Sequence, residues 1–407
     1  MQFVSRTAAR DRVSPNLLMV VCLAAVSDIR ANEKAIADLE REANQVLSEP
    51  DNIVRRARIA PVFQLAERFA AAGKTNEALK YYTKALEHQP WNLDAQLALA
   101  RLQDAGGDTN SARQKLELVW KHAETDALLA QAATLLGRPF ATILEQESLP
   151  TETFALALVP YGETDVWLLV ELREDLKKTL GVPVIIRQSP LQIPQPDRDS
   201  LHLRAEDLRE RIAKARKDPG FEALLRRLNF APSALAEDEQ VFVVTEAVLN
   251  AEKDKEPAKR FREELTFLRR LGPQWDANEL IRRLGTSLAV KPGSGMGYLG
   301  VTRMDLYSNE SRYVFGLAAQ GANCGIFSYR RYTSAVAEDP PNRERLRARS
   351  LKQALSTVGL LFGLPRCTDP TCARAYVNSL AEHDAKQGKL CPQCQQGFAK
   401  RFGRKAD

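Results

Sequence analysis

Apolar positions recur at helical spacing through the first third of the chain, from about residue 28 to residue 140. Spacings of three, four and seven residues place these side chains on one face of a helix. The first such face comprises Ile29, Ile36, Leu39, Ala43 and Val46. We expect this helix to end near Pro50, because proline clashes with the preceding helical turn. The pattern predicts an all-helical module over 28–140.

Within this module a set of residues repeats with a period of 34. The repeat pairs Leu65, Ala66, Gly73, Asn76, Ala78 and Tyr82 with Leu99, Ala100, Gly107, Asn110, Ala112 and Leu116. Small residues let two helices cross closely, and glycine permits the tight turn between them. The pattern resembles tetratricopeptide (TPR) repeats, which implies a groove for a peptide or a partner protein. The alternative is a short helical support for the domain that follows.

Beyond Pro139 the hydrophobic pattern is no longer purely helical. Residues 153–159 and 182–186 are apolar runs that predict buried strands, and a helix beginning at Val166 separates them. Strand, helix, strand is typical of an α/β unit with a parallel or mixed sheet. The pattern also predicts a helix from Asp276, strands at 296–301, 313–317 and 325–329, and a long helix over 342–362.

A charged segment over about 199–271 interrupts the α/β pattern. Acidic and basic residues alternate within it, as in 206–211, which indicates solvated helical faces rather than a binding patch. One apolar run, 240–244, predicts a strand inside this otherwise helical segment. The chain ends in a basic tail over 399–407.

Two interpretations compete for residues 1–27. Arginines precede the apolar run 17–26, and the small Ser27 follows it, which is the pattern of a signal peptide. Alternatively, Ser14 caps a first core helix that has Pro15 at its first position. No stretch of the chain approaches the roughly 20 apolar residues that a transmembrane helix needs. We therefore expect no integral membrane segment.

Composition narrows the classes of function. The chain has 407 residues, 44% of them hydrophobic and 27% charged, which is ordinary for a globular protein of about two to three domains. A net charge of +6 with no clustered basic face gives no support for nucleic-acid binding. The four histidines, at 88, 122, 202 and 383, are too far apart in sequence to form a local pair of metal ligands.

Four of the six cysteines form two close pairs near the C-terminus: Cys367, Cys372, Cys391 and Cys394. Each pair can supply two thiolates from one turn, which is the arrangement that tetrahedral zinc requires. A four-thiolate site leaves no open position for substrate, so one zinc ion held there would be structural. Two disulfides, free thiols or a redox dithiol at the second pair are the alternatives.

Several segments together carry a specific family resemblance. They are Pro160-Tyr161-Gly162, Gln274-Trp275-Asp276-Ala277, residues 298–307 and 313–318, Leu361-Phe362-Gly363-Leu364, Asn378-Ser379-Leu380 and Cys391-Pro392-Gln393-Cys394. In order and spacing they resemble the archaemetzincin family of zinc metallopeptidases. The resemblance covers about 150–398, with 199–271 as an insertion. It implies a metzincin-like α/β domain with a structural zinc on the four cysteines and a separate catalytic zinc.

The catalytic motif of that family, H-E-x-x-H-x-x-G-x-x-H, is degenerate in this chain. In the family it ends directly before the first cysteine, so Gly363 and Cys367 fix its place here. The resemblance assigns its His, Glu, His and His positions to Ser356, Thr357, Leu360 and Arg366. The family's methionine after the second cysteine corresponds to Arg374. Neutral hydroxyls are poor zinc ligands, leucine offers no lone pair, and arginine repels a dication.

We therefore expect a catalytically inactive, archaemetzincin-like protein rather than an enzyme. The TPR-like repeats and the degenerate cleft would bind a peptide or protein partner, with one structural zinc ion. Two alternatives stay open: a zinc metallopeptidase with a non-standard site, for which Ser356 is the candidate nucleophile, and an assembly accessory that acts through its repeats. Zinc thiolates favour the cytoplasm over a secreted or periplasmic location, against the signal-like N-terminus.

Overall fold

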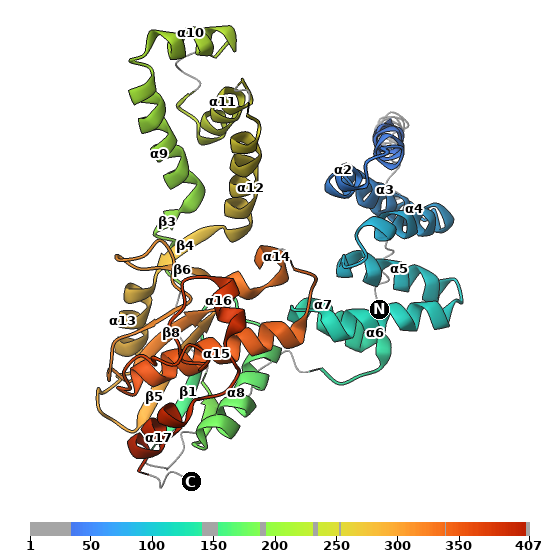
Figure 1. The fold of residues 1–407 in the computed structure, drawn as a ribbon. Coiled ribbons are helices and arrows are strands. Elements are labelled where there is room, and N and C mark those ends of the chain that lie inside the picture. Colours follow the sequence, from blue (N-terminus) through green and yellow to red (C-terminus); the bar gives the residue numbers. More distant parts are fainter. Residues whose placement is uncertain are drawn as a thin grey trace, which may run out of the picture. The chain divides into compact units, whose positions relative to one another are not determined.

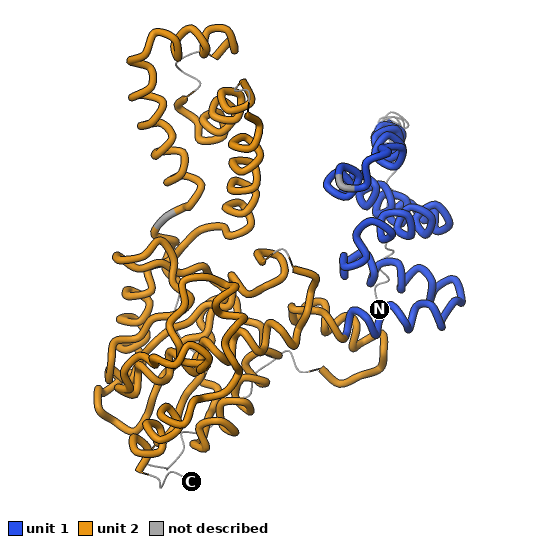
Figure 2. Tube along the Cα trace, in the orientation of Figure 1, with its two compact units in different colours: residues 1–120 blue, residues 121–407 orange. Residues whose placement is uncertain are grey.

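The computed structural model describes residues 34–140, 154–187, 193–230, 235–251, 254–337 and 339–403. The two interpretations of residues 1–27 fall outside these ranges, and so does the end of the basic tail. The chain divides into two compact units, residues 1–120 and residues 121–407 (Figure 2).

The first unit is helical, as the apolar pattern predicts. A helix over 34–47 is followed by α2 (Asn52–Ala57), α3 (Ala60–Ala71), α4 (Thr75–His88), α5 (Leu93–Ala105) and α6 (Thr109–His122) (Figure 1). The small residues Ala66 and Ala78 are fully buried where α3 packs against α4. The side chain of Asn92 accepts a hydrogen bond from the Ala95 N–H and so caps α5.

The second unit begins at the end of α6, continues through α7 (Asp126–Leu136) and contains a five-stranded sheet in the order β2-β1-β5-β8-β7. The strands in that order are Val184–Ile186, Ala155–Pro160, Met296–Thr302, Cys324–Ser328 and Gly316–Ala318. The first four are parallel, and the edge strand β7 is antiparallel to β8. In the register of the central strands, Leu158 lies opposite Ile186 and Leu299.

Helices cover both faces of this sheet, which is why its central strands are apolar throughout. Helices α8 (Val166–Leu180) and α15 (Arg343–Leu361) pack against each other on one face. Helix α13 (Ala277–Ser287) packs on the other face, where Leu280 and Leu284 join the core. The expected helix start is confirmed there, since the Asp276 side chain accepts a hydrogen bond from the backbone N–H of Asn278.

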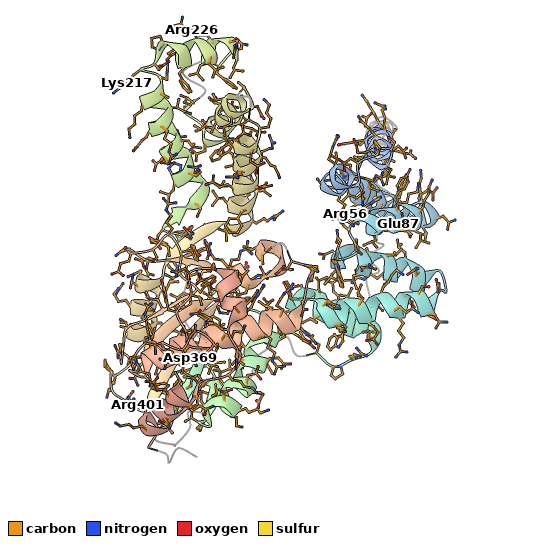
Figure 3. The ribbon with its side chains drawn as sticks, viewed as in Figure 1. Arg56, Glu87, Lys217, Arg226, Asp369 and Arg401 are labelled. Carbon is orange, nitrogen blue, oxygen red and sulfur yellow. The ribbon has the colours of Figure 1, made fainter. Side chains whose placement is uncertain are left out.

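A second, three-stranded sheet carries the charged segment. Strands β3 (Arg198–Asp199) and β4 (Pro273–Asp276) are antiparallel neighbours, and β6 (Asp305–Tyr307) pairs with β4 in parallel. Between β3 and β4 lie α9 (Ser200–Ala215), α10 (Pro219–Arg227), α11 (Asp238–Ala251) and α12 (Glu256–Leu271). This helical insertion leaves and rejoins the sheet at adjacent strands. Its exposed residues Lys217 and Arg226 lie at the end away from the sheet (Figure 3).

The strand predicted at 240–244 is wrong, because these residues lie within α11. Val241 and Val244 are buried at helical spacing, and the ring of Phe242 packs 6.4 Å from that of Phe261 in α12. A short apolar run is compatible with either a strand or a buried helix. Here the helices of the insertion form a hydrophobic core of their own, and packing into that core favours the helix. The strand predicted over 313–317 starts only at Gly316.

The C-terminal part of the second unit completes the domain. It contains the short helices η2 (Arg330–Tyr332) and α14 (Ser334–Ala337), then α16 (Leu380–Ala385) and α17 (Pro392–Arg401) after α15. None of the helices described has both the length and the apolar character needed to cross a bilayer. The predicted fold class is confirmed: a helical N-terminal region precedes an α/β domain that contains a four-cysteine cluster.

Candidate metal centre and adjacent pocket

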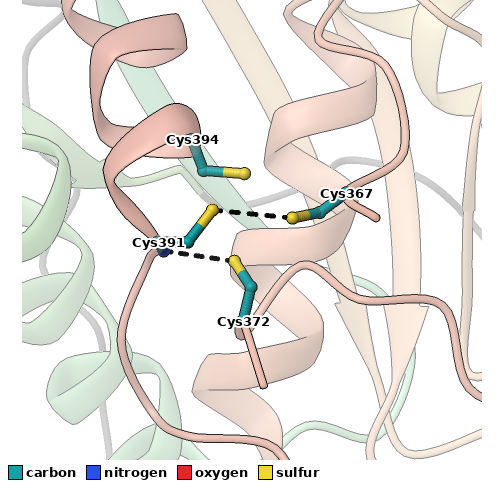
Figure 4. Close-up of side chains that lie close together, drawn as sticks. All are labelled: Cys367, Cys372, Cys391 and Cys394. Carbon is teal, nitrogen blue, oxygen red and sulfur yellow. Dashed lines mark hydrogen bonds between the residues drawn. The ribbon is translucent and has the colours of Figure 1, made fainter. Parts of the chain in front are cut away.

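The four cysteines predicted to bind zinc converge in space (Figure 4). Their sulfur atoms all lie within 4.8 Å of one another, and the Sγ atoms of Cys367 and Cys391 are 3.6 Å apart. Zinc–sulfur bonds of about 2.3 Å in a tetrahedron would separate the sulfurs by about 3.8 Å. The described cysteines form no disulfide with one another. The donor set and its spacing therefore fit a tetrahedral thiolate site.

Local backbone structure places these thiols. Cys391 is the N-cap of α17 and Pro392 occupies its first position, so Cys394 falls in the first helical turn. The backbone N–H groups of Cys391 and Arg374 point at Cys372 and donate to its Sγ over 3.3 and 3.4 Å. Such donors stabilise a thiolate ligand from outside the first coordination shell.

Arg374 brings a positive charge to the cluster. The residue is 4% exposed, and its Nη1 donates to the Sγ of Cys394 over 3.2 Å. Burial raises the pKa of the Cys394 thiol, while the nearby Arg374 charge lowers it. A buried thiolate needs this kind of positive partner, because an isolated charge is costly in a low dielectric.

A pocket of about 350 Å³ lies beside this cluster. Its wall comprises the loop 308–315, strand β7, one face of α15, Arg366 and the segment 374–378. The structure brings together in this wall all four positions assigned to the degenerate motif: Ser356, Thr357, Leu360 and Arg366. Helical spacing accounts for the first three, and the turn after α15 brings in the fourth.

Thr357, at the position assigned to the catalytic glutamate, is a packed core residue. It is 1% exposed, and its Oγ1 donates to the Gln353 carbonyl oxygen over 3.0 Å. The same Oγ1 accepts from Gln353 Nε2 over 3.2 Å, and Gln353 Oε1 accepts from the Tyr332 hydroxyl. Hydrogen bonds inside the protein therefore engage Thr357, which has no acidic group with which to activate water.

Arg366 stands where the third histidine is assigned. Gly363 ends α15 in a left-handed conformation (φ 88°), which glycine adopts without steric cost, and the chain turns there toward Arg366. The exposed Arg366 guanidinium stacks on the ring of Tyr376, 4.3 Å from its centroid. Tyr376 is itself 61% exposed. The pair forms a cationic, aromatic edge of the pocket.

Three comparisons place this chain among known proteins. The model of peptidase family M54 matches residues 289–400, and a tetratricopeptide repeat model matches residues 69–136. An archaemetzincin of Pyrococcus furiosus is 34% identical over 128 residues, which are 31% of this chain and 62% of that protein. An archaemetzincin of Haloarcula marismortui is 30% identical over 125 residues, 30% of this chain and 69% of that protein. This chain belongs to the archaemetzincin family.

The similarity is partial in extent. The match spans less than two thirds of the Pyrococcus furiosus archaemetzincin. The crystal structure of the Methanopyrus kandleri archaemetzincin aligns with 63% of this chain and 100% of that chain, at 18% sequence identity and a TM-score of 0.36. The two family-model matches confirm the resemblance inferred from the sequence segments and the TPR resemblance of the N-terminal helices.

The described histidines of this chain lie outside the pocket. Among the described residues that line the pocket there is no histidine. His383 is fully buried, with its ring 4.8 Å from Tyr332 and 5.9 Å from Phe315. His122 contacts the Pro341 carbonyl oxygen over 3.2 Å. Within the described ranges, the four cysteines are the one group of three or more His, Cys, Asp or Glu side chains close enough to hold an ion.

Arg374 is the site residue whose role the sequence did not reveal. Its Nη2 donates to the carbonyl oxygens of Leu364 and Pro365 over 3.3 and 2.8 Å, directly before Arg366. The same side chain bonds Cys394 and lines the pocket. It therefore connects the cysteine cluster to the turn that carries Arg366. The signal in the sequence was an arginine at the position assigned to the family's methionine.

Proposed function

We propose that this member of the archaemetzincin family is catalytically inactive and that it binds a peptide or protein segment in the pocket without cleaving it. In this proposal the four cysteines hold one zinc ion, which stabilises the fold and takes no part in chemistry. The observation that carries the proposal is the identity of the residues at the four motif positions, which line one pocket and offer no zinc ligand.

The chemistry of the pocket wall supports inactivity. A catalytic zinc needs about three protein ligands and an open position for water or substrate. The described pocket wall offers the carboxylate of Glu310 and the hydroxyl of Ser356, whereas Arg366 brings a positive charge. Thr357 is held by Gln353. Thr357, at the position assigned to the glutamate that activates water, has no acidic group, and the one carboxylate of the described wall, Glu310, lies in the loop 308–315 and not on α15.

The sheet edge supports peptide binding. Strand β7 is an edge strand, and its residues Gly316 and Leu317 line the pocket. Edge strands present backbone N–H and C=O groups that can pair with an extended chain. A peptide added to β7 would run along the pocket past α15. The TPR-like helices would supply a second contact and raise the overall affinity through avidity.

Metal counting tests the number of zinc ions. We expect purified, zinc-saturated protein to contain about one tightly bound zinc per chain by elemental analysis. The reason is that the four cysteines are the one group of metal ligands found among the described residues, and together they hold one ion. The double variant Cys391→Ser/Cys394→Ser should contain none. Two zinc ions per chain in the unaltered protein would contradict the proposal.

Family membership favours a second candidate, a zinc-dependent metallopeptidase with a non-standard site. A mixed peptide library incubated with the zinc-loaded protein separates the two. We expect no cleavage above the level of a heat-denatured control. Cleavage that chelators abolish and that Ser356→Ala alters would establish the metallopeptidase instead.

A third candidate is an assembly accessory that acts through its repeats alone, favoured by the tetratricopeptide match. Measuring how well deletion and pocket variants capture a partner protein distinguishes this candidate from a protein that binds through its pocket. If the repeats act alone, deletion of residues 50–120, which lie within the first unit, abolishes capture and substitutions in the pocket have no effect. The proposed function predicts that the deletion weakens capture and that pocket substitutions weaken it further.

A further inference from the structure

We infer that the pocket receives a carboxylate group and that Arg366 recognises it. The inference rests on the proposed function, since it specifies what part of a bound peptide the pocket would hold. It starts from the charges in the wall. Arg312, Arg366 and Arg374 line the pocket together with one carboxylate, that of Glu310, and Arg374 is itself paired with the Cys394 sulfur, so the recognition is assigned to Arg366.

Arg366 is placed to contact a ligand directly. Its guanidinium is exposed and held against the ring of Tyr376, so little side-chain freedom is lost when it binds. In the described part of the chain, no carboxylate lies within ion-pair distance of Arg366. A planar guanidinium pairs with a carboxylate through two parallel hydrogen bonds, which makes it selective for that group.

The groups around Arg366 strengthen the attraction. Pro365, its neighbour in sequence, is anchored by the buried Arg374, whose side chain also forms part of the pocket floor. Positive charge in a partly enclosed cleft acts through a lower dielectric than water and attracts anions. The half-buried Ser356 lies in the same wall and offers a hydroxyl donor for a carboxylate oxygen. Glu310 in the same wall opposes the attraction, so the preference for a carboxylate depends on direct contact with Arg366.

The carboxylate has two possible sources, the C-terminus of a peptide or the side chain of Asp or Glu. The probe is a library of fluorescent hexapeptides, made once with free C-termini and once as C-terminal amides, with and without acidic residues. Affinities for zinc-loaded full-length protein are measured by anisotropy at low and high salt.

We expect selected peptides with a carboxylate to bind about tenfold more tightly than their uncharged amides, which corresponds to about 1.4 kcal/mol. Arg366→Gln should abolish this preference, and Arg366→Lys should restore part of it because the charge remains. High salt should reduce the preference in the unaltered protein. Arg226→Gln, the same charge change on an exposed residue at the end of the helical insertion, should have no effect. A preference for free C-termini over internal acidic residues identifies the first source, and the reverse identifies the second.

Two failures are distinguishable. If peptides bind equally well as uncharged amides, or if Arg366→Gln leaves the preference intact, the carboxylate inference is wrong while peptide binding stands. If no peptide in either library binds, the proposed function fails and the inference fails with it. Circular dichroism and zinc content of each variant confirm that the fold is retained.

Discussion

Gly359 in α15 has no side chain, and the Arg374 side chain occupies the space next to it. A Cβ atom placed on Gly359 would overlap the guanidinium of Arg374, which packs across the helix at this residue. We expect Gly359→Ala to destabilise the protein by about 2 kcal/mol, because overpacking forces the neighbours out of position. Urea unfolding measures the loss.

The same substitution made together with Arg374→Met separates this contact from a general effect on the helix. Methionine is flexible and smaller at its end, so Gly359→Ala should cost less in that background. An equal cost in both backgrounds would show that the clash with Arg374 is not the cause.

We expect the buried His383 to make the free energy of unfolding depend on pH. Burial, followed by the charges of Lys386 and Lys352, lowers the pKa of His383 to about 2, and Arg349 adds to the effect. Arg349 also donates to Asp384, which is the nearby counter-charge. In the unfolded chain the pKa returns to about 6.5. Below that pH the unfolded state takes up a proton that the folded state does not, so stability falls as pH falls.

The measurement is the unfolding free energy of the unaltered protein and of His383→Phe between pH 6.5 and 4. Phenylalanine keeps the ring contacts with Tyr332 and Phe315. We expect the unaltered protein to lose up to about 1.4 kcal/mol per pH unit more than the variant. Acid release of metal from the thiolates affects both proteins and cancels in the difference. Parallel curves would show that His383 does not titrate in this way.

At the scale of elements, one buried ion pair joins strand β6 to helix η2. Asp305 is 1% exposed and accepts two hydrogen bonds from Arg331, over 2.7 and 2.9 Å, and a third from Gln274 Nε2 in β4. Arg331 also stacks on Tyr313, 3.9 Å from its ring centroid, in the pocket wall. The Asp305–Arg331 pair therefore positions two parts of the domain: the three-stranded sheet and the loop 308–315 that lines the pocket.

We expect Asp305→Ala to cost about 3–5 kcal/mol, because it leaves the Arg331 charge buried without its partner. Glu210→Ala provides the control in the insertion. Glu210 pairs with Lys214 over 3.9 Å, and both side chains are exposed, so its loss should cost less than about 1 kcal/mol. Denaturant unfolding compares the two, and similar costs would contradict the role assigned to burial.

At the scale of the whole molecule, residues 121–140, which form the end of the TPR-like module with helix α7, belong to the second unit. The Glu124 carboxylate accepts hydrogen bonds from the N–H and hydroxyl of Ser334 and from the N–H of Asn342, over 2.8, 2.9 and 3.1 Å. Asp126 accepts from the N–H groups of Val166 and Trp167 and so caps α8. Residues far from α8 and α15 in sequence thus complete their N-terminal ends.

We expect a fragment of residues 121–407 to fold with a stability close to that of the same region in the full chain. A fragment of residues 141–407 should be less stable by about 2 kcal/mol or more, because the buried N–H groups lose their acceptors. Glu124→Ala/Asp126→Ala in the full chain should reproduce most of this loss. Equal thermal stability of the two fragments would contradict this account.

The features that the sequence determined by itself are those set by local spacing and residue chemistry. The 34-residue period, the paired cysteines and the order of the family segments are all readable along the chain. The helices and strands with strong periodicity were therefore predictable, and so were the four positions that the structure collects in the pocket wall. Short elements such as β3, β4 and β6 were missed because two to four residues carry no period.

Tertiary contacts decided the rest, because they join residues whose separation in sequence hides their interaction. The run 240–244 is helical because Phe242 packs against Phe261 in α12, a contact that no local pattern specifies. Arg374 donates a hydrogen bond to Cys394 and packs against Gly359 of α15, and both contacts depend on the tertiary fold. The sequence alone thus identified the four cysteines that could hold a metal ion. Burial and charge in the folded molecule decided what surrounds them.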